Sequence, residues 1–362
     1  MNIENLIYSF AEKNNLTSGI CLAEDFDFLR PVLEKRNHLL KGFAEQNIQK
    51  RISPKLTFPN AKSIIVLAMN YNKKFSFLHD DKLRGHFSIG AVGTDYHTLL
   101  KEKLLELGNL LQNHSISFQA FVDTGALVDR ETALRACIGY RGKNCSIHIP
   151  EKGSMIFIGY LLVDKLLSPS SKAFLESCGD CKKCIASCPS GALLENDPFA
   201  IEKCISYITQ KKGLLSHWEM KTIGLQLYGC DICQITCPHN QNNPLSNSVS
   251  PEELTPLLSS ILSLSNKQFQ ETIGKTAAGW VGKKIIQRNA VAVLGNIHKK
   301  ESLFILQKCF SDMRPLIRHT AVRAIYNLNL KEGITVLKGA LKKETEFEIQ
   351  EEMEQAIFFL EQ

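Results

Sequence analysis

The chain has 362 residues, of which 44% are hydrophobic and 22% are charged, and its formal net charge is +6. A chain of this length holds two or three domains, and the composition is ordinary for a globular protein with a sizeable core. No run approaches the roughly 18 apolar residues that a membrane helix needs, and the N-terminus lacks the pattern of a secretory signal. We therefore expect a cytoplasmic protein with no membrane partner.

The first part of the chain alternates predicted strands with a predicted helix. Apolar, β-branched runs predict strands at 62–71, 118–125 and 153–164. Residues 95–114 predict an amphipathic helix, because five leucines recur near helical spacing, namely Leu99, Leu100, Leu104, Leu107 and Leu111. Residues 1–168 are thus predicted to form a mixed α/β domain.

One of these strands ends in polar residues. Asp123 follows the apolar run 118–122 and directly precedes Thr124 and Gly125. A carboxyl group at the end of a strand can face a pocket, where burial raises its pKa and prepares it to donate a proton. From the residue type alone, a turn aspartate or a helix cap is the commoner role.

Cysteines are concentrated between residues 178 and 237. The run "CGDCKKCIASCP" has the spacing C-x2-C-x2-C-x3-C-P, which is typical of bacterial ferredoxins, and its cysteines are Cys178, Cys181, Cys184 and Cys188. In this motif three thiolates bind one cubane, and the fourth commonly reaches a second cluster. Twelve cysteines in a reducing compartment indicate metal ligands or buried thiols before disulfides.

A second run, Cys230-x2-Cys233-x3-Cys237-Pro238, is one ligand short, and Cys204 is the obvious substitute. The crossing rule then predicts two 4Fe–4S clusters, one bound by Cys178, Cys181, Cys184 and Cys237, the other by Cys188, Cys204, Cys230 and Cys233. Two all-thiolate zinc sites would also use eight cysteines, although zinc sites rarely show this spacing. The other cysteines, Cys21, Cys137, Cys145 and Cys309, are predicted to be buried thiols.

The last part of the chain is helical and repetitive. After a polar connector at 242–257, residues 289–297 align with residues 320–328 at a spacing of 31. This spacing fits a helical-hairpin repeat of the HEAT type, although two amphipathic helices can also resemble each other by chance.

Charge is distributed unevenly over this helical segment. Residues 275–343 contain 14 Lys and Arg against 3 acidic residues, whereas residues 344–362 contain 7 Glu and no base. A basic block of this kind indicates a polyanionic partner, and the alternative is an ordinary solvated helical face.

Taken together, these motifs resemble the epoxyqueuosine reductase family, whose members depend on cobalamin and iron–sulfur clusters and complete queuosine in tRNA. The resemblance spans nearly the whole chain. It rests on the two cysteine runs together with "KRISP" (50–54), "GTDYH" (93–97), "VDTGALVDR" (122–130), "GYRGKNC" (139–145), "CISYITQKKG" (204–213) and "LYGCDICQITCP" (227–238).

The resemblance implies an α+β protein with three parts: a cobalamin-binding catalytic domain (1–168), a ferredoxin-like domain with two 4Fe–4S clusters (169–245) and HEAT-like repeats with a basic surface (246–362). It implies electron transfer through the clusters to cobalamin, reduction of epoxyqueuosine at the wobble base, and Asp123 as proton donor. By motif position, it places near cobalamin Arg51, Ser88, Asp123, Ile147, Lys203, Gln210 and Asp231.

The resemblance also implies that cobalamin is bound base-off, without a His ligand. This agrees with "DYHTLL" (95–100), in which Leu100 stands where a cobalt-binding Asp-x-His-x-x-Gly pattern has glycine. We expect a monomer that accepts electrons from a flavodoxin- or ferredoxin-type donor. Contacts with tRNA phosphates are expected from Lys212, Lys283, Lys284, Arg288 and Arg318, with Arg314 and Arg323 beside them.

Two other interpretations remain open from the sequence. A reductive dehalogenase-like enzyme would share cobalamin and two clusters, but such enzymes usually carry a twin-arginine leader, and no such leader is visible here. A two-cluster electron-transfer protein would need no N-terminal domain of this size.

Overall fold

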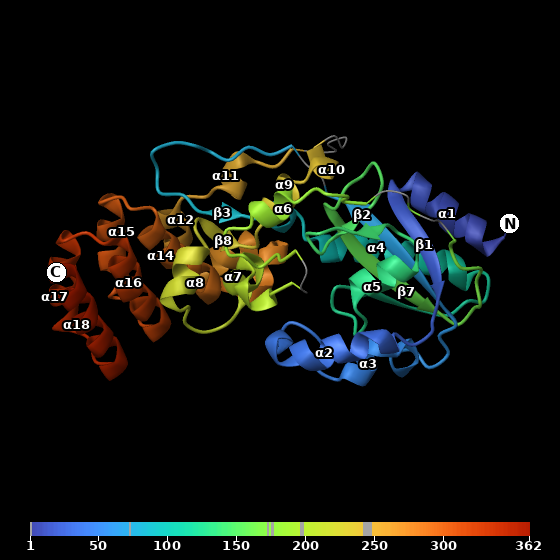
Figure 1. Ribbon diagram of the computed structural model, residues 1–362, viewed down its shortest axis with the longest axis horizontal. Coiled ribbons are helices and arrows are strands. Elements are labelled where there is room, and N and C mark those ends of the chain that lie inside the picture. Colours follow the sequence, from blue (N-terminus) through green and yellow to red (C-terminus); the bar gives the residue numbers. More distant parts are fainter. Residues whose placement is uncertain (1, 72–73, 172–173, 175–176, 196–198, 242–247) are drawn as a thin grey trace.

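The computed structural model describes residues 2–362 except 72–73, 172–173, 175–176, 196–198 and 242–247. The chain forms an elongated molecule with the N-terminal domain at one end and a stack of helices at the other, and the cysteine-rich segment lies between them (Figure 1). No described helix combines the length and the apolar character that crossing a lipid bilayer requires.

A four-stranded antiparallel sheet organises the N-terminal domain, with the strand order β1-β2-β7-β4. Three of its strands confirm the predicted ones, since β2 spans Ser63–Asn70, β4 spans Phe118–Val122 and β7 spans Ile156–Val163. The edge strand β1 (Leu16–Leu22) had no counterpart among the predicted elements. Its centre reads Thr-Ser-Gly, and Gly19 is required because a Cβ there would lie 1.9 Å from the carbonyl oxygen of Ala136.

Helices cover both faces of this sheet. The predicted helix is α4 (Tyr96–Gln112), which packs on one face with α1 (Ile3–Lys13) and buries Leu100, Leu104, Leu107 and Leu111. The other face is covered by α5 (Asp129–Arg135), and the core on this side extends to Leu33 of α2 (Arg30–Arg36) and Ile52 of α3 (Ile48–Ile52). Antiparallel strands with helices on both faces make this an α+β domain, as the resemblance implies.

The cysteine-rich segment consists of short elements. They are α6 (Lys183–Ala186), the 3-10 turn η5 (Ile201–Lys203), α7 (Ile205–Gln210), α8 (His217–Thr222), β8 (Gln226–Tyr228), α9 (Ile232–Ile235) and α10 (Pro238–Gln241). Strand β8 pairs in parallel with β3 (His86–Phe87), which belongs to a long excursion from the N-terminal domain. Two segments far apart in sequence are thereby joined. Two shorter strands, β5 (Tyr140–Arg141) and β6 (Ile147–His148), pair with each other.

The C-terminal part is helical throughout. After α11 (Pro251–Leu254), α12 (Leu258–Ser263) and α13 (Asn266–Glu271), the chain forms α14 (Lys283–Asn296), α15 (Glu301–Cys309), α16 (Pro315–Leu328), α17 (Glu332–Leu341) and α18 (Phe347–Glu361). The two aligned repeat segments lie at the ends of α14 and α16, which pack side by side. Gly295 permits this contact, because a Cβ there would lie 2.6 Å from the carbonyl oxygen of Ala324.

Side chains of helix α14 also form hydrogen bonds between the repeats and the cysteine-rich segment. The Asn289 amide donates to the carbonyl oxygens of Thr209 and Leu227, and the Asn296 amide donates to those of Met220 and Gly224. A single apolar cluster runs from Ile205 and Leu227 through α14 to Leu360. The cysteine-rich segment and the repeats therefore share one core.

Candidate functional site

Four of the predicted cluster ligands line one small cavity. Cys178, Cys181, Cys184 and Cys237 surround it, together with Lys143, Asn144 and His148 from the N-terminal domain. The backbone N–H of Lys143 donates to Sγ of Cys178 over 3.4 Å. The cavity thus brings together the first three cysteines of one run and the last cysteine of the other.

The remaining four predicted ligands line a second cavity. They are Cys188, Cys204, Cys230 and Cys233, and Arg130 of the N-terminal domain borders the same space. Burial raises the pKa of Cys204, and it raises that of Cys230 to about 12. Such thiols stay protonated at neutral pH unless a metal replaces the proton.

The spacing of these side chains bears on the kind of metal. Among the described residues, no three His, Cys, Asp or Glu side chains are arranged to hold a single metal ion. Four thiols that line one cavity can bind the four irons of a cubane, and the chain has two such cavities.

Asp123 lies at the centre of a hydrogen-bonded group at the end of β4. The hydroxyl of Tyr96 donates to its Oδ2 over 2.6 Å, and Nε2 of His97 lies 3.6 Å from the same oxygen. On its other side, Nδ1 of His97 lies 2.7 Å from Oδ1 of Asp95. Tyr96 and His97 begin α4, whose N-cap is Asp95, so one helix end positions three of these four residues.

The charges in this group are complementary. The contact with His97 and, after it, the hydrogen bond from Tyr96 lower the pKa of Asp123, although burial opposes them. The contact with Asp123 and the hydrogen bond with Asp95 raise the pKa of His97. The side chain of Asp123 is 62% exposed. Asp123 is therefore an accessible carboxylate in this arrangement, and His97 is the neighbour that holds a proton. From the sequence alone, "DYH" (95–97) indicates only a broken cobalt-binding pattern, because nothing local to it predicts a contact with Asp123.

Arg51 lies close to this centre and is almost completely buried, at 7% exposure. Within the described residues, its Nε and Nη1 have no hydrogen-bond partner, and neither has Oδ1 of Asp129. Burial lowers the pKa of Arg51, and the nearby Asp129 partly offsets this. Buried polar atoms without partners usually indicate an absent ligand or water, because leaving them unpaired is costly.

Three further candidates lie along the seam between the N-terminal and cysteine-rich parts. Asp231 is buried and accepts a 2.6 Å hydrogen bond from the N–H of Ile89, and burial raises its pKa to about 6. Ser88 donates its N–H to Tyr228 and packs against Gly229. Gln210 accepts a hydrogen bond from the indole of Trp280, which also donates to the Tyr228 hydroxyl. The charge of Asp123 contributes to the raised pKa of Tyr228, so Tyr228 and the residues that contact it lie near the Asp123 centre.

The last two candidates for cobalamin contacts are placed differently. The side chain of Ile147 is buried in the core of the N-terminal domain, and Lys203 is exposed on η5. Neither has a described contact with the Asp123 centre.

Several basic side chains of the block 275–343 are less exposed to solvent than the sequence suggested. Arg288 is fully buried, and its guanidinium donates to four carbonyl oxygens, those of Ile208, Thr209, Lys211 and Gly213. The expectation that it contacts a phosphate is therefore wrong, because Arg288 instead binds the loop after α7 to the repeats.

The acidic C-terminal segment covers other basic residues of the block. Arg318 forms two hydrogen bonds with Glu344, and Arg323 forms one with Glu352. Arg314 pairs with Asp312. The side chain of Arg318 is only 12% exposed, so Glu344 and its surroundings cover most of it.

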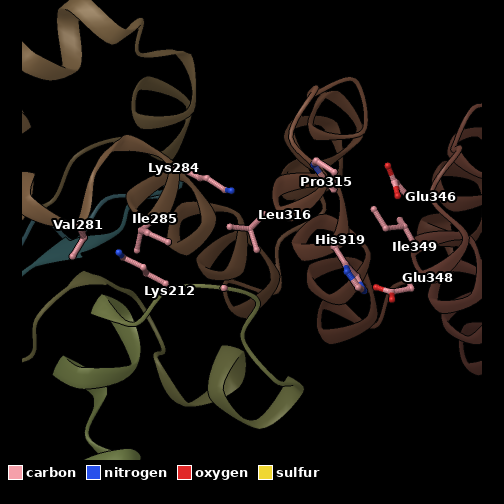
Figure 2. Close-up of a pocket in the computed structure, with 11 residues that line it drawn as sticks. Lys212, Val281, Lys284, Ile285, Pro315, Leu316, His319, Glu346, Glu348 and Ile349 are labelled. Atoms are coloured by element: carbon pink, nitrogen blue, oxygen red, sulfur yellow. The ribbon is translucent and has the colours of Figure 1, made fainter. Parts of the chain in front are cut away.

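Lys212 and Lys284 remain exposed, and Lys283, half-buried, donates to the carbonyl of Leu264 over 3.2 Å. The exposed lysines border a cavity of about 510 Å³. Figure 2 shows Lys212, Val281, Lys284 and Ile285 on one side of it, and α16 with the start of α18 on the other. Glu346 and Glu348 line the far side, so the positive charge is confined to the side formed by α14 and the loop after α7.

Comparison with known proteins agrees with this arrangement. Residues 51–124 match the family model described as "Epoxyqueuosine reductase QueG, DUF1730", residues 177–240 match a 4Fe-4S double cluster binding domain, and residues 282–357 match HEAT repeats. An epoxyqueuosine reductase of Bacillus subtilis (strain 168) is 37% identical over 354 residues, which cover 94% of this chain and 92% of that protein.

Solved structures are equally similar. The crystal structure of an epoxyqueuosine reductase with an epoxyqueuosine-modified stem loop of tRNA-Tyr superposes with a TM-score of 0.92 at 36% identity, covering 100% of both chains. A Bacillus subtilis epoxyqueuosine reductase, described with the catalytic loop of an aspartate swung out of the active site, gives a TM-score of 0.90 at 35% identity, covering 99% of this chain and 100% of that one. The chain belongs to the epoxyqueuosine reductase family.

Proposed function

We propose that this enzyme reduces epoxyqueuosine to queuosine at the wobble position of tRNA. The observation that carries the proposal is the position of the Asp123 centre beside a domain whose eight cysteines line two cavities. The overall change is the loss of the epoxide oxygen as water, with two electrons and two protons consumed and a carbon–carbon double bond formed. A site for it must deliver electrons singly, exclude bulk water and protonate an oxygen.

The clusters would be bound as the cavities group the thiols. One would take Cys178, Cys181, Cys184 and Cys237, and the other Cys188, Cys204, Cys230 and Cys233. The exposure of Cys181 suits entry of electrons from an external flavodoxin- or ferredoxin-type donor. Arg130 borders the second cavity and lies near Asp123, so that cavity adjoins the catalytic centre.

The residues around Asp123 also fit a cobalamin. Its rim carries amide groups, which both donate and accept hydrogen bonds. Nε and Nη1 of Arg51 and Oδ1 of Asp129, which have no partner in the part of the chain that the structure describes, offer the matching donors and acceptor. Ser88, Gln210 and Asp231 would border it along the seam. When bound, cobalamin would supply a strongly reducing cobalt centre that passes the electrons to the substrate. His97 is already engaged by Asp95 and Asp123, so it would not be among the residues that hold the group.

The proton is the part that the protein itself supplies. Asp123 is ionised in this arrangement, so it first has to gain a proton before it can act as an acid. His97, whose pKa is raised, lies next to it and can hand over the proton as bound RNA covers the exposed carboxylate, because desolvation raises the pKa of a carboxyl group. We infer that Asp123 and His97 act as one acid, and that Tyr96 holds Asp123 in place.

Lys212, Lys283 and Lys284 would bind phosphates of the tRNA and position it without reading its sequence. The test of the whole proposal is anaerobic reconstitution with iron, sulfide and cobalamin, followed by mass spectrometry of nucleosides from a tRNA that carries epoxyqueuosine. The expected result is queuosine, formed only when a reductant and cobalamin are both present. Stoichiometric cluster assembly and cobalamin binding without queuosine would contradict the proposal.

A further inference from the structure

The turn between β5 and β6 places one asparagine beside both cysteine-lined cavities. Two backbone hydrogen bonds of 2.9 Å close this turn, from the N–H of Gly142 to the carbonyl of Ser146 and from the N–H of Cys145 to the carbonyl of Gly142. Asn144 lies within the turn, and its residue is only 6% exposed. Among the residues that the structure describes, Asn144 alone lines both cavities.

The carbonyl end of this side chain is held in place. Oδ1 of Asn144 accepts a 3.1 Å hydrogen bond from the N–H of Ser146, and Nε2 of His148 lies 3.1 Å from the same oxygen. Because an amide oxygen can only accept, Nε2 of His148 is the donor in this contact. Gly142 packs against the pair, where a Cβ would lie 2.3 Å from Nε2 of His148 and 2.9 Å from Oδ1 of Asn144. The two donors therefore fix which end of the amide is oxygen.

The other end of the amide has nothing to bind in the protein. Nδ2 of Asn144 is buried and has no hydrogen-bond partner within the described ranges of the chain. A buried donor is costly to leave unpaired, so such a group usually faces an absent ligand or water. Sulfur is within reach of this turn, since the neighbouring N–H of Lys143 already donates to Sγ of Cys178 over 3.4 Å. Hydrogen bonds to the sulfurs of an iron–sulfur cluster are among the factors that set its reduction potential.

We propose that the side-chain amide of Asn144 donates a hydrogen bond to a sulfur atom of one cluster and thereby raises the reduction potential of that cluster. The cluster concerned, here called the first cluster, is the one held by Cys178, Cys181, Cys184 and Cys237. Lys143 and His148, which flank Asn144 and hold its oxygen, line this cavity and not the other. An N–H aimed at sulfur stabilises the negative charge that a cluster gains on reduction. The inference rests on the grouping of ligands in the proposed function.

Pulsed electron paramagnetic resonance of the reduced full chain gives the first test. The protein is made with asparagine labelled with nitrogen-15 in the side-chain amide and is reconstituted with iron and sulfide. A hyperfine coupling of the label to the first cluster is expected, and it should vanish in Asn144→Asp, which keeps an oxygen acceptor for Ser146 and His148. Cys181→Ser and Cys204→Ser, each of which alters one cluster, assign the signals.

A redox titration gives the second readout. Asn144→Leu should make the ratio of reduced to oxidised first cluster about tenfold smaller at a fixed potential, which corresponds to a midpoint about 59 mV lower for one electron. The matched control is Asn296→Leu, which also removes an amide that donates to two carbonyls but borders neither cavity, and both potentials should stay unchanged in it.

The outcomes separate this inference from the proposed function. Wild-type protein that assembles both clusters but shows no coupling of the label to the first cluster overturns the inference and leaves the proposed function intact. An unchanged potential of the first cluster in Asn144→Leu, or a change confined to the other cluster, also overturns it. Should Asn144→Leu not assemble its clusters, the coupling in wild type decides, because it depends on no variant. Failure of wild-type protein to bind clusters overturns the inference and the proposed function together.

Discussion

The hydroxyl of Tyr96 donates a 2.6 Å hydrogen bond to Oδ2 of Asp123 and thereby joins the first turn of α4 to the end of β4, which lie 27 residues apart in sequence. Burial and the neighbouring carboxylate both raise the pKa of this phenol, so it stays protonated and always donates. Tyr96 and His97 both approach Oδ2 of Asp123, so this is the carboxylate oxygen that they hold.

Asp123→Asn is expected to retain tRNA binding while losing most turnover. The substitution is nearly isosteric, but the amide cannot transfer a proton, and general acid catalysis typically contributes about 10²–10⁴ in rate. Single-turnover formation of queuosine, measured by nucleoside mass spectrometry, checks this. Asp27→Asn, at an exposed aspartate, is the matched control. Turnover within a few-fold of wild type would reduce Asp123 to a turn residue.

His97 should determine the alkaline limb of the pH–rate profile. Its pKa is raised by Asp123 and Asp95, and the protonated imidazole is the form that supplies the proton. Turnover should therefore be constant at pH values below the raised pKa of His97 and decrease as the pH rises through it. The decrease should thus lie above the ordinary histidine pKa of about 6.5. His97→Gln should be slow and should lack this limb. His114→Gln is the control and should keep the alkaline limb. If His97→Gln also keeps the limb unchanged, the titrating group is another residue.

Cys204→Ser should damage one cluster and leave the other. Wild-type protein is expected to hold about eight irons after reconstitution, and the variant about four, because Cys204 lines only the second cavity. Iron analysis and electron paramagnetic resonance of the reduced protein measure this. Cys309→Ala is the control, since Cys309 is buried in the repeats. Identical iron content and spectra in Cys204→Ser would contradict the crossed grouping of the ligands.

Arg288→Met should destabilise the protein rather than merely weaken tRNA binding. The change leaves four carbonyl oxygens without their buried donor, which should lower the free energy of unfolding by at least about 3 kcal/mol. Urea denaturation monitored by circular dichroism provides the measurement. Lys284→Ala, four residues earlier on the same helix and exposed, should leave stability within about 0.5 kcal/mol of wild type. Equal stability of the two variants would contradict the structural role of Arg288.

Lys284→Ala should instead act on RNA binding. If Lys284 neutralises one phosphate, the slope of log K against log salt should become shallower by roughly 0.7–0.9. Titration of a labelled anticodon stem loop at several salt concentrations gives this slope. The control is Lys267→Ala, an 85% exposed lysine outside the cavity that Lys284 lines. An unchanged slope would place the RNA on another surface.

Local sequence determined the parts of this protein that depend on short-range chemistry. The spacing of the cysteine runs dictates which thiols can reach one cubane, and the proline after each run directs the last cysteine away, so the grouping of eight thiols could be predicted before any fold was known. The amphipathic period of 95–114 and the apolar runs of β2, β4 and β7 were predicted for the same reason. Strand β1 was missed because its core contacts depend on Gly19 meeting the backbone of Ala136, which no periodicity records.

Only the tertiary structure decided which charged groups are free. Arg288 and Lys284 lie one turn apart on α14, and both are basic. Their residue types do not show that Arg288 is buried and bound to carbonyl oxygens, whereas Lys284 is exposed. The acidic C-terminal segment could shield the basic block or leave it open, and the fold pairs Glu344 with Arg318 and Glu352 with Arg323. The charge state of Asp123 likewise depends on Tyr96 and His97, which the start of α4 brings to the end of β4. Burial and hydrogen bonding set the electrostatic character of each group, and both are properties of packed neighbours rather than of sequence position.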